Sequence, residues 1–371
     1  MRDKKIITMF APYMAEDAIT QAAAILKSCW IGQGPFVDKF EKEVEKTLGI
    51  HHAVAVNCSS SALRLALDLC GVGPGDEVIT TPLTCTITNH PILEQYATPV
   101  FADIQLDTGN IDPSDIEKRI THRTKAIMCT HWAGYPCDLD ELNRVGERHG
   151  LPIIEDASEA FGASYRGRPI GAISRFTVFS FQAIQIITTG EGGMLVASTE
   201  RDADQARIRR WYGIDRNRRK PNSLGYYDFD ITSVGYGYHL TDISASIGIA
   251  NLASLPMRVK RRREIALSYR EAFGRISGIR LLNSVDDRQS SNPYFMMHVN
   301  QREEFCRMMS ANGIQVSIVH HRNDAYSVFG GLRSDLPQLD RFARTYIGLP
   351  VHTQLTDDDT GYIIRSVQSG W

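Results

Sequence analysis

This sequence of 371 residues has a small net charge and lacks long apolar runs. Its 41 basic and 43 acidic side chains leave a formal net charge of only −2. A chain so close to neutral has no overall field that would recruit nucleic acid or an anionic membrane, so we expect neither as a partner. No stretch approaches the 18 apolar residues that indicate a membrane-spanning helix. The first seven residues also lack the apolar core of a signal peptide.

Cysteine pairs with the spacing of a zinc site are absent as well. The seven cysteines are an odd number, and they are scattered between Cys29 and Cys306 without a C-x-x-C pair. Such usage is typical of reduced thiols in a cytoplasmic protein rather than of a metal site or a disulfide framework. We therefore expect a cytoplasmic protein with no metal ion.

Lysine is missing from a long central stretch, because none lies between Lys125 and Lys220. This stretch contains FSFQAIQIITTGEGGML, residues 179–195, where an apolar strand and a glycine-rich turn lead into a second apolar strand. Such a layout usually surrounds a reactive group, yet the position where a nucleophile is expected holds Gln185. The sequence therefore raises the question of an enzyme without its key residue.

Short apolar runs alternate with helical patterns through the first two thirds of the chain. Several runs are continuous rather than alternating, which is typical of strands that are covered on both faces. Strands that alternate with helices predict an α/β fold with a mostly parallel sheet. The strand-like runs are 53–56, 77–81, 99–104, 126–130, 152–155, 177–181 and 194–197.

The pattern changes from about Asp242 onward. A long helical stretch follows, with a break or bend at Pro256, and then come strand-like runs at 279–282, 294–299 and 316–321. We expect a large domain over residues 1–249 and a smaller α+β domain over residues 250–371. The polar segment 217–230 is predicted to be a mobile loop.

Hydroxyl groups gather at the start of one predicted helix, in the sequence Asn57-Cys58-Ser59-Ser60-Ser61. The unpaired amides of a helix N-terminus and nearby hydroxyls together make a phosphate site. The alternative is that one serine only caps the helix.

Two further candidates lie at the ends of predicted strands. Glu155 and Asp156 end a buried apolar strand, where acids are costly to ionise without a cationic partner, unless both only cap the next helix. Ser180 also ends a strand, and the glycine turn at 190–193 lets the backbone approach another group closely. A hairpin uses the same turn chemistry, so this third signal is weak alone.

Taken together and in this order, these motifs resemble the DegT/DnrJ/EryC1/StrS family of sugar aminotransferases. The resemblance runs nearly end to end, through WIGQGPFVDKFEKEVEKTLGI, NCSSSALRLAL, IIEDASEAFGASYRGRPIGAI, FSFQAIQIITTGEGGML and VGYGYHLTDISASIGIANL. It implies the α/β aspartate aminotransferase fold, with pyridoxal 5′-phosphate or pyridoxamine 5′-phosphate as cofactor. It also implies a homodimer, because the site of the family lies between subunits.

The resemblance implies a role for each motif. Asp156 would pair with the protonated ring nitrogen of the cofactor, and Glu159 would lie near its phenolic oxygen. The cofactor phosphate would be held by Ser60, Ser61 and Ser180. In the family, a lysine that forms the Schiff base occupies the position of Gln185. An amide has no basic nitrogen, so Gln185 can neither form that bond nor accept a proton.

Other departures from the family pattern also affect the site. The ring-stacking aromatic of the family aligns near Cys85, so we expect His131 or Trp132 either to cover the cofactor instead or to be a packed strand residue. The asparagine that reaches the phosphate of the other subunit aligns with Gly237. His320 and His321 fall near a family motif that reaches the active site, which makes them candidate substrate contacts.

A basic run within 207–220 has two interpretations. It either forms a solvated helix and loop face or binds an anionic part of the substrate, in its own subunit or across the dimer. The run consists of Arg207, Arg209, Arg210, Arg216, Arg218, Arg219 and Lys220.

The sequence therefore predicts the scaffold of a sugar aminotransferase. Its parent would move an amino group from glutamate or a similar donor to a keto or aldehyde sugar, nucleotide-linked, in deoxyamino-sugar synthesis. With Gln185, the chain is expected to be inactive or to accumulate the external aldimine. The alternatives are a diverged dehydratase-like enzyme with another base, such as His131, and a non-catalytic protein that binds the cofactor or a sugar as a sensor.

Overall fold

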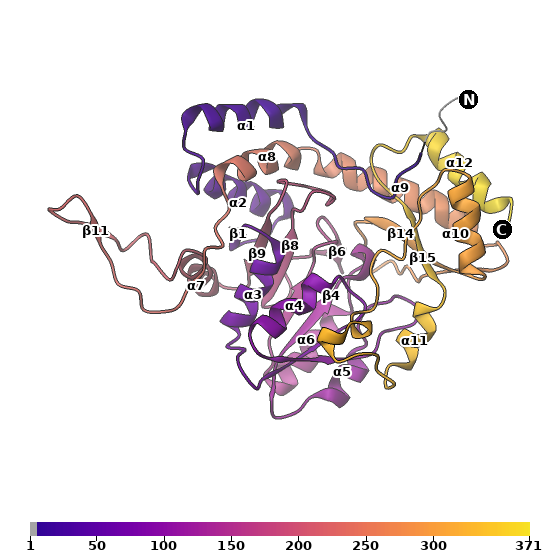
Figure 1. The fold of residues 1–371 in the computed structure, drawn as a ribbon, viewed down its shortest axis with the longest axis horizontal. Coiled ribbons are helices and arrows are strands. Elements are labelled where there is room, and N and C mark those ends of the chain that lie inside the picture. The colour runs from indigo at the N-terminus through magenta and orange to yellow at the C-terminus, as the bar shows by residue number, and fades with distance from the viewer. Residues whose placement is uncertain (1–5) are drawn as a thin grey trace.

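The computed structural model describes residues 6–371, and their main feature is a large sheet flanked by helices (Figure 1). The strand order in this sheet is β1-β9-β8-β5-β4-β2-β3, and β9 runs antiparallel to both of its neighbours while the other strands are parallel. This confirms the predicted α/β class. The strands are β1 (Ala53–Val56), β2 (Glu77–Thr80), β3 (Thr98–Phe101), β4 (Thr124–Thr130), β5 (Ile153–Asp156), β8 (Phe176–Ser180) and β9 (Gly193–Ala197).

Apolar clusters cover both faces of this sheet, which explains the continuous apolar runs of its strands. One cluster joins the sheet to α3, α4 and α7, and the other joins it to α2, α6 and α8. The helices of these layers are α2 (Pro35–Leu48), α3 (Ser59–Leu69), α4 (Thr86–Glu94), α5 (Pro113–Arg119), α6 (Leu139–His149), α7 (Glu200–Arg210) and α8 (Asp242–Leu252), with α1 (Glu16–Ser28) packed outside α8.

A second, antiparallel sheet has the order β12-β14-β15 and packs against the long helix α9. The chain breaks at residues 253–254, so that Pro256 falls in the first turn of α9, where its missing amide hydrogen costs nothing. The elements are α9 (Leu255–Phe273), β12 (Ile279–Leu281), β14 (Tyr294–Val299), α10 (Arg302–Ala311), α11 (Pro337–Ala343), β15 (Tyr346–Pro350) and α12 (Asp357–Gln368).

The C-terminal apolar cluster also includes a residue from the other end of the chain. Ile7 pairs with Ile314 in a parallel bridge and shares this cluster with Ile265 of α9. The division into residues 1–249 and 250–371 stays a prediction. Ile7 belongs to its first part but packs in the apolar cluster of the second. The strand expected at 316–321 was wrong, because Ser317 makes only an isolated bridge to Gly348.

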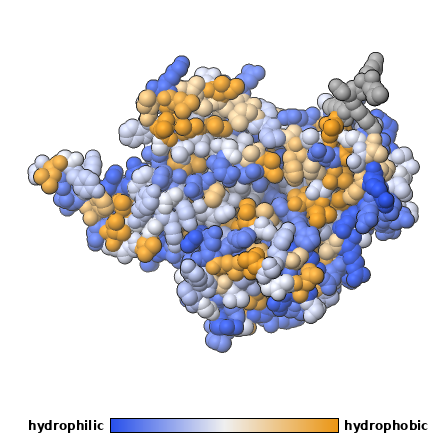
Figure 2. Space-filling model, viewed as in Figure 1, coloured by the Kyte–Doolittle hydropathy of each residue, from blue (hydrophilic) through white to orange (hydrophobic). Residues whose placement is uncertain are grey.

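The segment 217–230, predicted to be a mobile loop, contains a short hairpin of β10 (Lys220–Pro221) and β11 (Tyr227–Asp228). The hairpin stands away from the body of the molecule (Figure 1) and carries exposed apolar side chains (Figure 2). Leu224 at its tip is 89% exposed. The remaining short elements are β6 (Ser164–Tyr165), β7 (Arg168–Pro169), β13 (Arg288–Gln289) and the 3₁₀ turns Trp132–Gly134, Asn323–Ala325 and Ser327–Phe329.

Within residues 6–371, no helix has both the length and the apolar content needed to cross a bilayer.

Candidate active site

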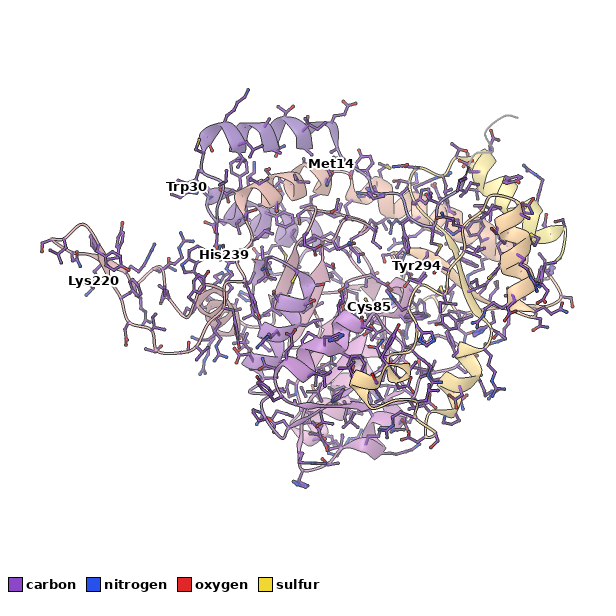
Figure 3. The ribbon with its side chains drawn as sticks, viewed as in Figure 1. Met14, Trp30, Cys85, Lys220, His239 and Tyr294 are labelled. Carbon is purple, nitrogen blue, oxygen red and sulfur yellow. The ribbon has the colours of Figure 1, made fainter. Side chains whose placement is uncertain are left out.

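A cavity of about 440 Å³ lies where the carboxyl ends of β1, β5 and β8 meet the C-terminal part of the chain. This edge is where parallel sheets place their ligands. Cys85 faces the cavity from the start of α4, and Tyr294 faces it from β14 of the small sheet (Figure 3). The site is therefore built by segments from both halves of the sequence.

The first turn of α3 forms one end of the cavity. Cys58 is the extended residue before the helix, and Ser59 and Ser60 follow it on the cavity wall. Ser180, at the end of β8, lies on the same wall. The first amides of a helix have no carbonyl partner within it, so this end is suited to an anion such as a phosphate.

Gly193 explains how β9 can pass so close to this helix start. A Cβ atom on Gly193 would lie 2.4 Å from the carbonyl carbon of Cys58 and 2.5 Å from the amide nitrogen of Ser59. The glycine turn was predicted to allow a close approach, and the group approached by Gly193 is the backbone at the start of α3. Only glycine leaves this space open.

The carboxylate of Asp156 is buried and held by hydroxyl and amide donors. Thr88 donates to Oδ2 at 2.6 Å, and Ser158 donates to Oδ1 from its hydroxyl at 2.6 Å and its amide at 3.0 Å. No basic side chain within residues 6–371 forms an ion pair with Asp156. A buried carboxylate on a cavity wall without a cationic partner is suited to a cationic ligand group.

Glu159 connects the large sheet with the small one. Its Oε2 accepts hydrogen bonds from the Tyr294 hydroxyl at 2.5 Å and the Ala133 amide at 3.1 Å, and its Oε1 lies 2.8 Å from His320 Nε2. Burial lowers the pKa of His320, but the Glu159 carboxylate and the Cys85 side chain outweigh this effect and raise the pKa to about 10. His320 is therefore a cation at neutral pH.

Gln185 lies half-buried on the cavity wall, in the turn that follows β8. The backbone amide of Gln185 donates to the backbone carbonyl of Gln182 at 2.9 Å, and this hydrogen bond closes the turn. The structure thus brings most predicted site residues to one cavity: Ser60, Asp156, Glu159, Ser180, Gln185 and His320.

Ser61 and His321 are not on the cavity wall. The Ser61 hydroxyl lies 3.2 Å from the sulfur of Cys58 within the first turn of α3, and the His321 ring packs edge-on against Tyr326. His320 lines the cavity and His321 does not, so the structure brings only His320 to this site. Their roles as cofactor and substrate contacts stay predictions.

His131 and Trp132 do not cover the cavity either. The Nδ1 atom of fully buried His131 accepts a hydrogen bond from the Cys137 amide, and its Nε2 lies 2.8 Å from a Glu155 carboxylate oxygen. Trp132 packs behind His320, with ring centroids 5.8 Å apart. With both ring nitrogens of His131 engaged away from the cavity, the hypothesis that it serves as the base was wrong.

Several residues of the site were not predicted from the sequence. Thr88 and Tyr294 are the clearest cases, because each is far in sequence from the carboxylate that it contacts. No local pattern marks them. Cys58 lay within the predicted helix start, and its position beside the serines could have drawn attention to it.

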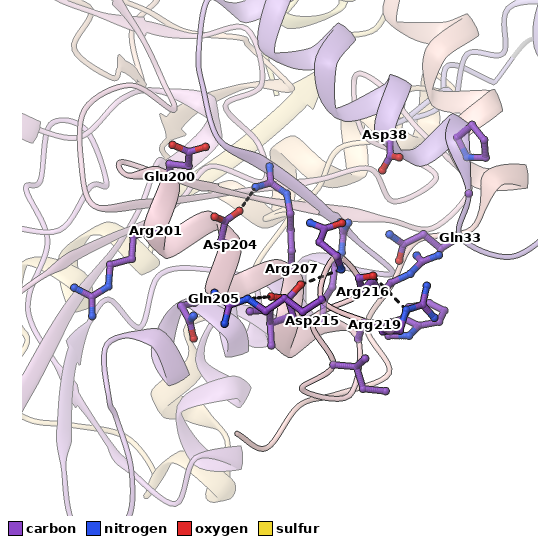
Figure 4. A pocket seen from close by; sticks show the side chains of 18 of the residues that line it. Gln33, Asp38, Glu200, Arg201, Asp204, Gln205, Arg207, Asp215, Arg216 and Arg219 are labelled. Carbon is purple, nitrogen blue, oxygen red and sulfur yellow. Dashed lines mark hydrogen bonds and ion pairs between the residues drawn. The ribbon is translucent and has the colours of Figure 1, made fainter. Parts of the chain in front are cut away.

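The basic run lies around a separate cleft of about 900 Å³, lined by α7, the start of α2 and the chain that follows α7 (Figure 4). Many of its charges are already paired: Arg207 with Asp204, Arg218 with Asp215, and buried Arg210 with Glu41. These pairs favour the interpretation as a structural and solvated face.

The chain is similar to known proteins over nearly its whole length. The model of the DegT/DnrJ/EryC1/StrS aminotransferase family matches residues 12–368. The chain is 36% identical to the spore coat polysaccharide biosynthesis protein SpsC of Bacillus subtilis, over 96% of this chain and 95% of that protein. It is 34% identical to GDP-perosamine synthase of Caulobacter vibrioides, over 99% of each chain.

Solved structures of similar proteins have the same fold. The sugar aminotransferase CalS13 of Micromonospora echinospora is 35% identical and superposes with a TM-score of 0.94, over 99% of this chain and 100% of that one. Spr1654 of Streptococcus pneumoniae is 30% identical, with a TM-score of 0.91 over 98% of each chain in its PLP form, and it is also known in a PMP form. The aspartate aminotransferase fold and the cofactor inferred from the sequence are confirmed.

Proposed function

The chain belongs to the DegT/DnrJ/EryC1/StrS aminotransferase family, and from this premise we propose that it is a sugar aminotransferase impaired at Gln185. Pyridoxal phosphate is the cofactor of the family, and the cavity residues fit it in part. Asp156 and the start of α3 match its two charged ends. Gln185 does not fit, because no amine is present there to bond with the aldehyde.

Each charged end of the cofactor has a proposed partner. When bound, the cofactor supplies a cationic ring that accepts electrons from the substrate. Asp156 would bind the ring nitrogen and keep it protonated, with Thr88 and Ser158 holding the carboxylate in place. The hydroxyls of Ser60 and Ser180, with Ser61 and the first amides of α3, would bind the phosphate.

Proton transfer is the step that the chain is poorly equipped to perform. The amide of Gln185 has no basic nitrogen, and His320 is already protonated at neutral pH because its pKa is raised to about 10. His320 would therefore donate a hydrogen bond rather than remove a proton. This argues against the diverged enzyme that uses another base, and a cofactor or sugar sensor is the remaining alternative.

The substrates and the oligomeric state are further parts of this proposal. We expect a nucleotide-linked keto or aldehyde sugar as acceptor and glutamate as donor. His320, whose Nε2 atom contacts Glu159, and its neighbour His321 are the proposed sugar contacts. We expect a cytoplasmic homodimer, because all seven cysteines are free thiols and because α1 and the hairpin expose apolar side chains.

The test is to restore an amine with Gln185→Lys and to compare it with the unaltered chain and with Gln182→Lys. Gln182 also lines the cavity, so this control adds a lysine to the same cavity at another position. Each protein is incubated with pyridoxal phosphate, reduced with borohydride and digested. We expect only Gln185→Lys to carry the cofactor covalently on the peptide with position 185. In separate samples that are neither reduced nor digested, we expect only Gln185→Lys to convert the cofactor to pyridoxamine phosphate with glutamate.

Two results would contradict this proposal. One is that Gln185→Lys binds no cofactor, and the other is that it binds the cofactor but converts none of it with any amino donor. Turnover by the unaltered chain, at a rate like that of Gln185→Lys, would instead support a diverged enzyme.

A further inference from the structure

A second cavity lies on the other side of Trp132, between α9 and the chain that leads into β14. Its volume is about 390 Å³, which is within the range of small-molecule sites. Buried Trp132 and Tyr294 form its floor, and polar side chains such as Asn283 and Asn292 form its rim. Tyr294 borders the active-site cavity as well.

Two arginines of α9 enter this cavity from one face of the helix. Arg263 and Arg270 are seven residues apart, which places them on the same side and about 10 Å apart along the axis. Arg263 donates only to neutral oxygens, from Ser290, Gly162 and Gln289. Its guanidinium therefore keeps its full charge without a counter-ion.

Arg270 is less engaged than Arg263. Within residues 6–371, its one side-chain hydrogen bond runs from Nη1 to the Leu282 carbonyl at 3.0 Å. Burial lowers the pKa of both Arg263 and Arg270, and Tyr135 partly offsets the effect at Arg270. Two guanidinium groups partly withdrawn from water and without a carboxylate partner are unfavourable unless an anion joins them.

Three acidic side chains near the cavity, Asp138, Asp287 and Asp107, are paired with arginines other than Arg263 and Arg270. Arg288, the third arginine of the cavity, is neutralised by Asp287 and Asp138. Asp107, next to the cavity residue Thr108, pairs with Arg280 outside. The walls therefore present a net positive charge.

Trp132, on the floor of the cavity, has a buried donor without a partner within residues 6–371. Its ring is fully buried, and its Nε1 atom has no hydrogen-bond acceptor in the described chain. The ring nitrogen lies toward Gly109, where a Cβ atom would be 2.9 Å from it, and Gly109 follows the cavity residue Thr108. A buried N–H donor without an acceptor is rare in proteins.

We propose that this cavity binds a small molecule through a carboxylate or phosphate group, held by Arg263 and Arg270. Both groups offer several acceptor oxygens, and the guanidinium fork matches their geometry. The ligand would lie against the residues that hold Glu159, because the Ala133 amide and the Tyr294 hydroxyl donate to that carboxylate. The site is distinct from the cofactor cavity and does not depend on Gln185.

The test is to titrate the full chain with sodium phosphate and with sodium glutarate, against sodium chloride of equal ionic strength. Heat of binding and tryptophan fluorescence are the measurements, because the Trp132 ring lines the cavity. We expect saturable binding of at least one of the two anions, about tenfold weaker in Arg270→Gln and in Arg263→Gln, since each loses a charge-assisted bond. Binding of phosphate alone or of glutarate alone identifies the group that the site prefers.

Two control variants make the result specific. Arg280→Gln removes a nearby arginine that pairs with Asp107 outside the cavity, and it should bind as the unaltered chain does. Ser180→Ala weakens the phosphate end of the cofactor cavity, so it should remove only the heat of phosphate binding at that cavity and leave the binding that depends on Arg263 and Arg270 unchanged. The proposal is overturned if neither anion saturates, if Arg263→Gln and Arg270→Gln both bind normally, or if Ser180→Ala abolishes the binding.

Discussion

At the scale of single residues, the charge state of the site is set by one glutamate. Glu159 receives hydrogen bonds from a tyrosine and a backbone amide and contacts His320, which comes from a segment 161 residues further along the chain. The Glu159 carboxylate beside His320 raises the pKa of that imidazole. The pair therefore joins the two halves of the site as well as charging it.

This pair makes a prediction about pH. His320 has a pKa of about 10 in the folded chain, against an ordinary value of 6.5, so its contribution to stability is complete below pH 6.5 and is lost as the pH rises through about 10. We expect the free energy of unfolding to fall more between pH 6.5 and 10 in the unaltered chain than in His320→Gln. Denaturant unfolding at several pH values measures this, and parallel pH curves would contradict it.

At the scale of elements, the contact between β9 and the start of α3 shapes the phosphate end of the cavity. Val56 of β1 pairs with Gly193 of β9, so the two strands deliver Cys58 and Gly193 to one point. The close contact is between backbones, and no side-chain movement could relieve a clash there. A small change at this place should therefore affect both stability and binding.

The change we propose is Gly193→Ala. Its Cβ atom would lie 2.4 Å from the Cys58 carbonyl carbon, so β9 and α3 would have to separate, at a cost of about 1–3 kcal/mol. We expect a lower free energy of unfolding and weaker binding of pyridoxal phosphate, measured by denaturant unfolding and by cofactor titration. Gly73→Ala is the control, because a Cβ atom there would have no neighbour within 4 Å. Equal effects of the two changes would refute the explanation.

At the scale of the whole molecule, exposed apolar side chains gather on two projecting parts. Helix α1 and the chain after it expose Ile19, Leu26 and Trp30, and the hairpin exposes Leu224 (Figure 2). Soluble monomers rarely expose apolar side chains in such groups, so we expect these parts to be covered in the proposed homodimer.

We therefore expect Leu224→Asp to weaken the dimer, because burial of this side chain would leave a carboxylate without a partner. Sedimentation at several protein concentrations measures the dissociation. Tyr96→Asp is the control, since Tyr96 is 80% exposed but lies outside both projecting parts. A protein that is monomeric throughout, or a dimer that both changes weaken alike, would contradict the proposal.

Much of the large domain could be predicted because its signals are local. The run 53–56 coincides with β1, and the serine-rich start at 59–61 coincides with the beginning of α3. Buried strands have continuous apolar runs, and helices start at recognisable positions, whatever else the chain does. The strand expected at 316–321 failed because an apolar run does not by itself supply a pairing partner.

The sequence by itself determined the α/β fold, the family and the placing of Asp156 and Ser180 at strand ends, because these depend on patterns within short segments. Only the tertiary structure decided that Thr88 holds Asp156, that His320 rather than His321 faces the cavity, and that Tyr294 borders two cavities. Those relations depend on how distant segments pack, and no local pattern encodes the distance between them.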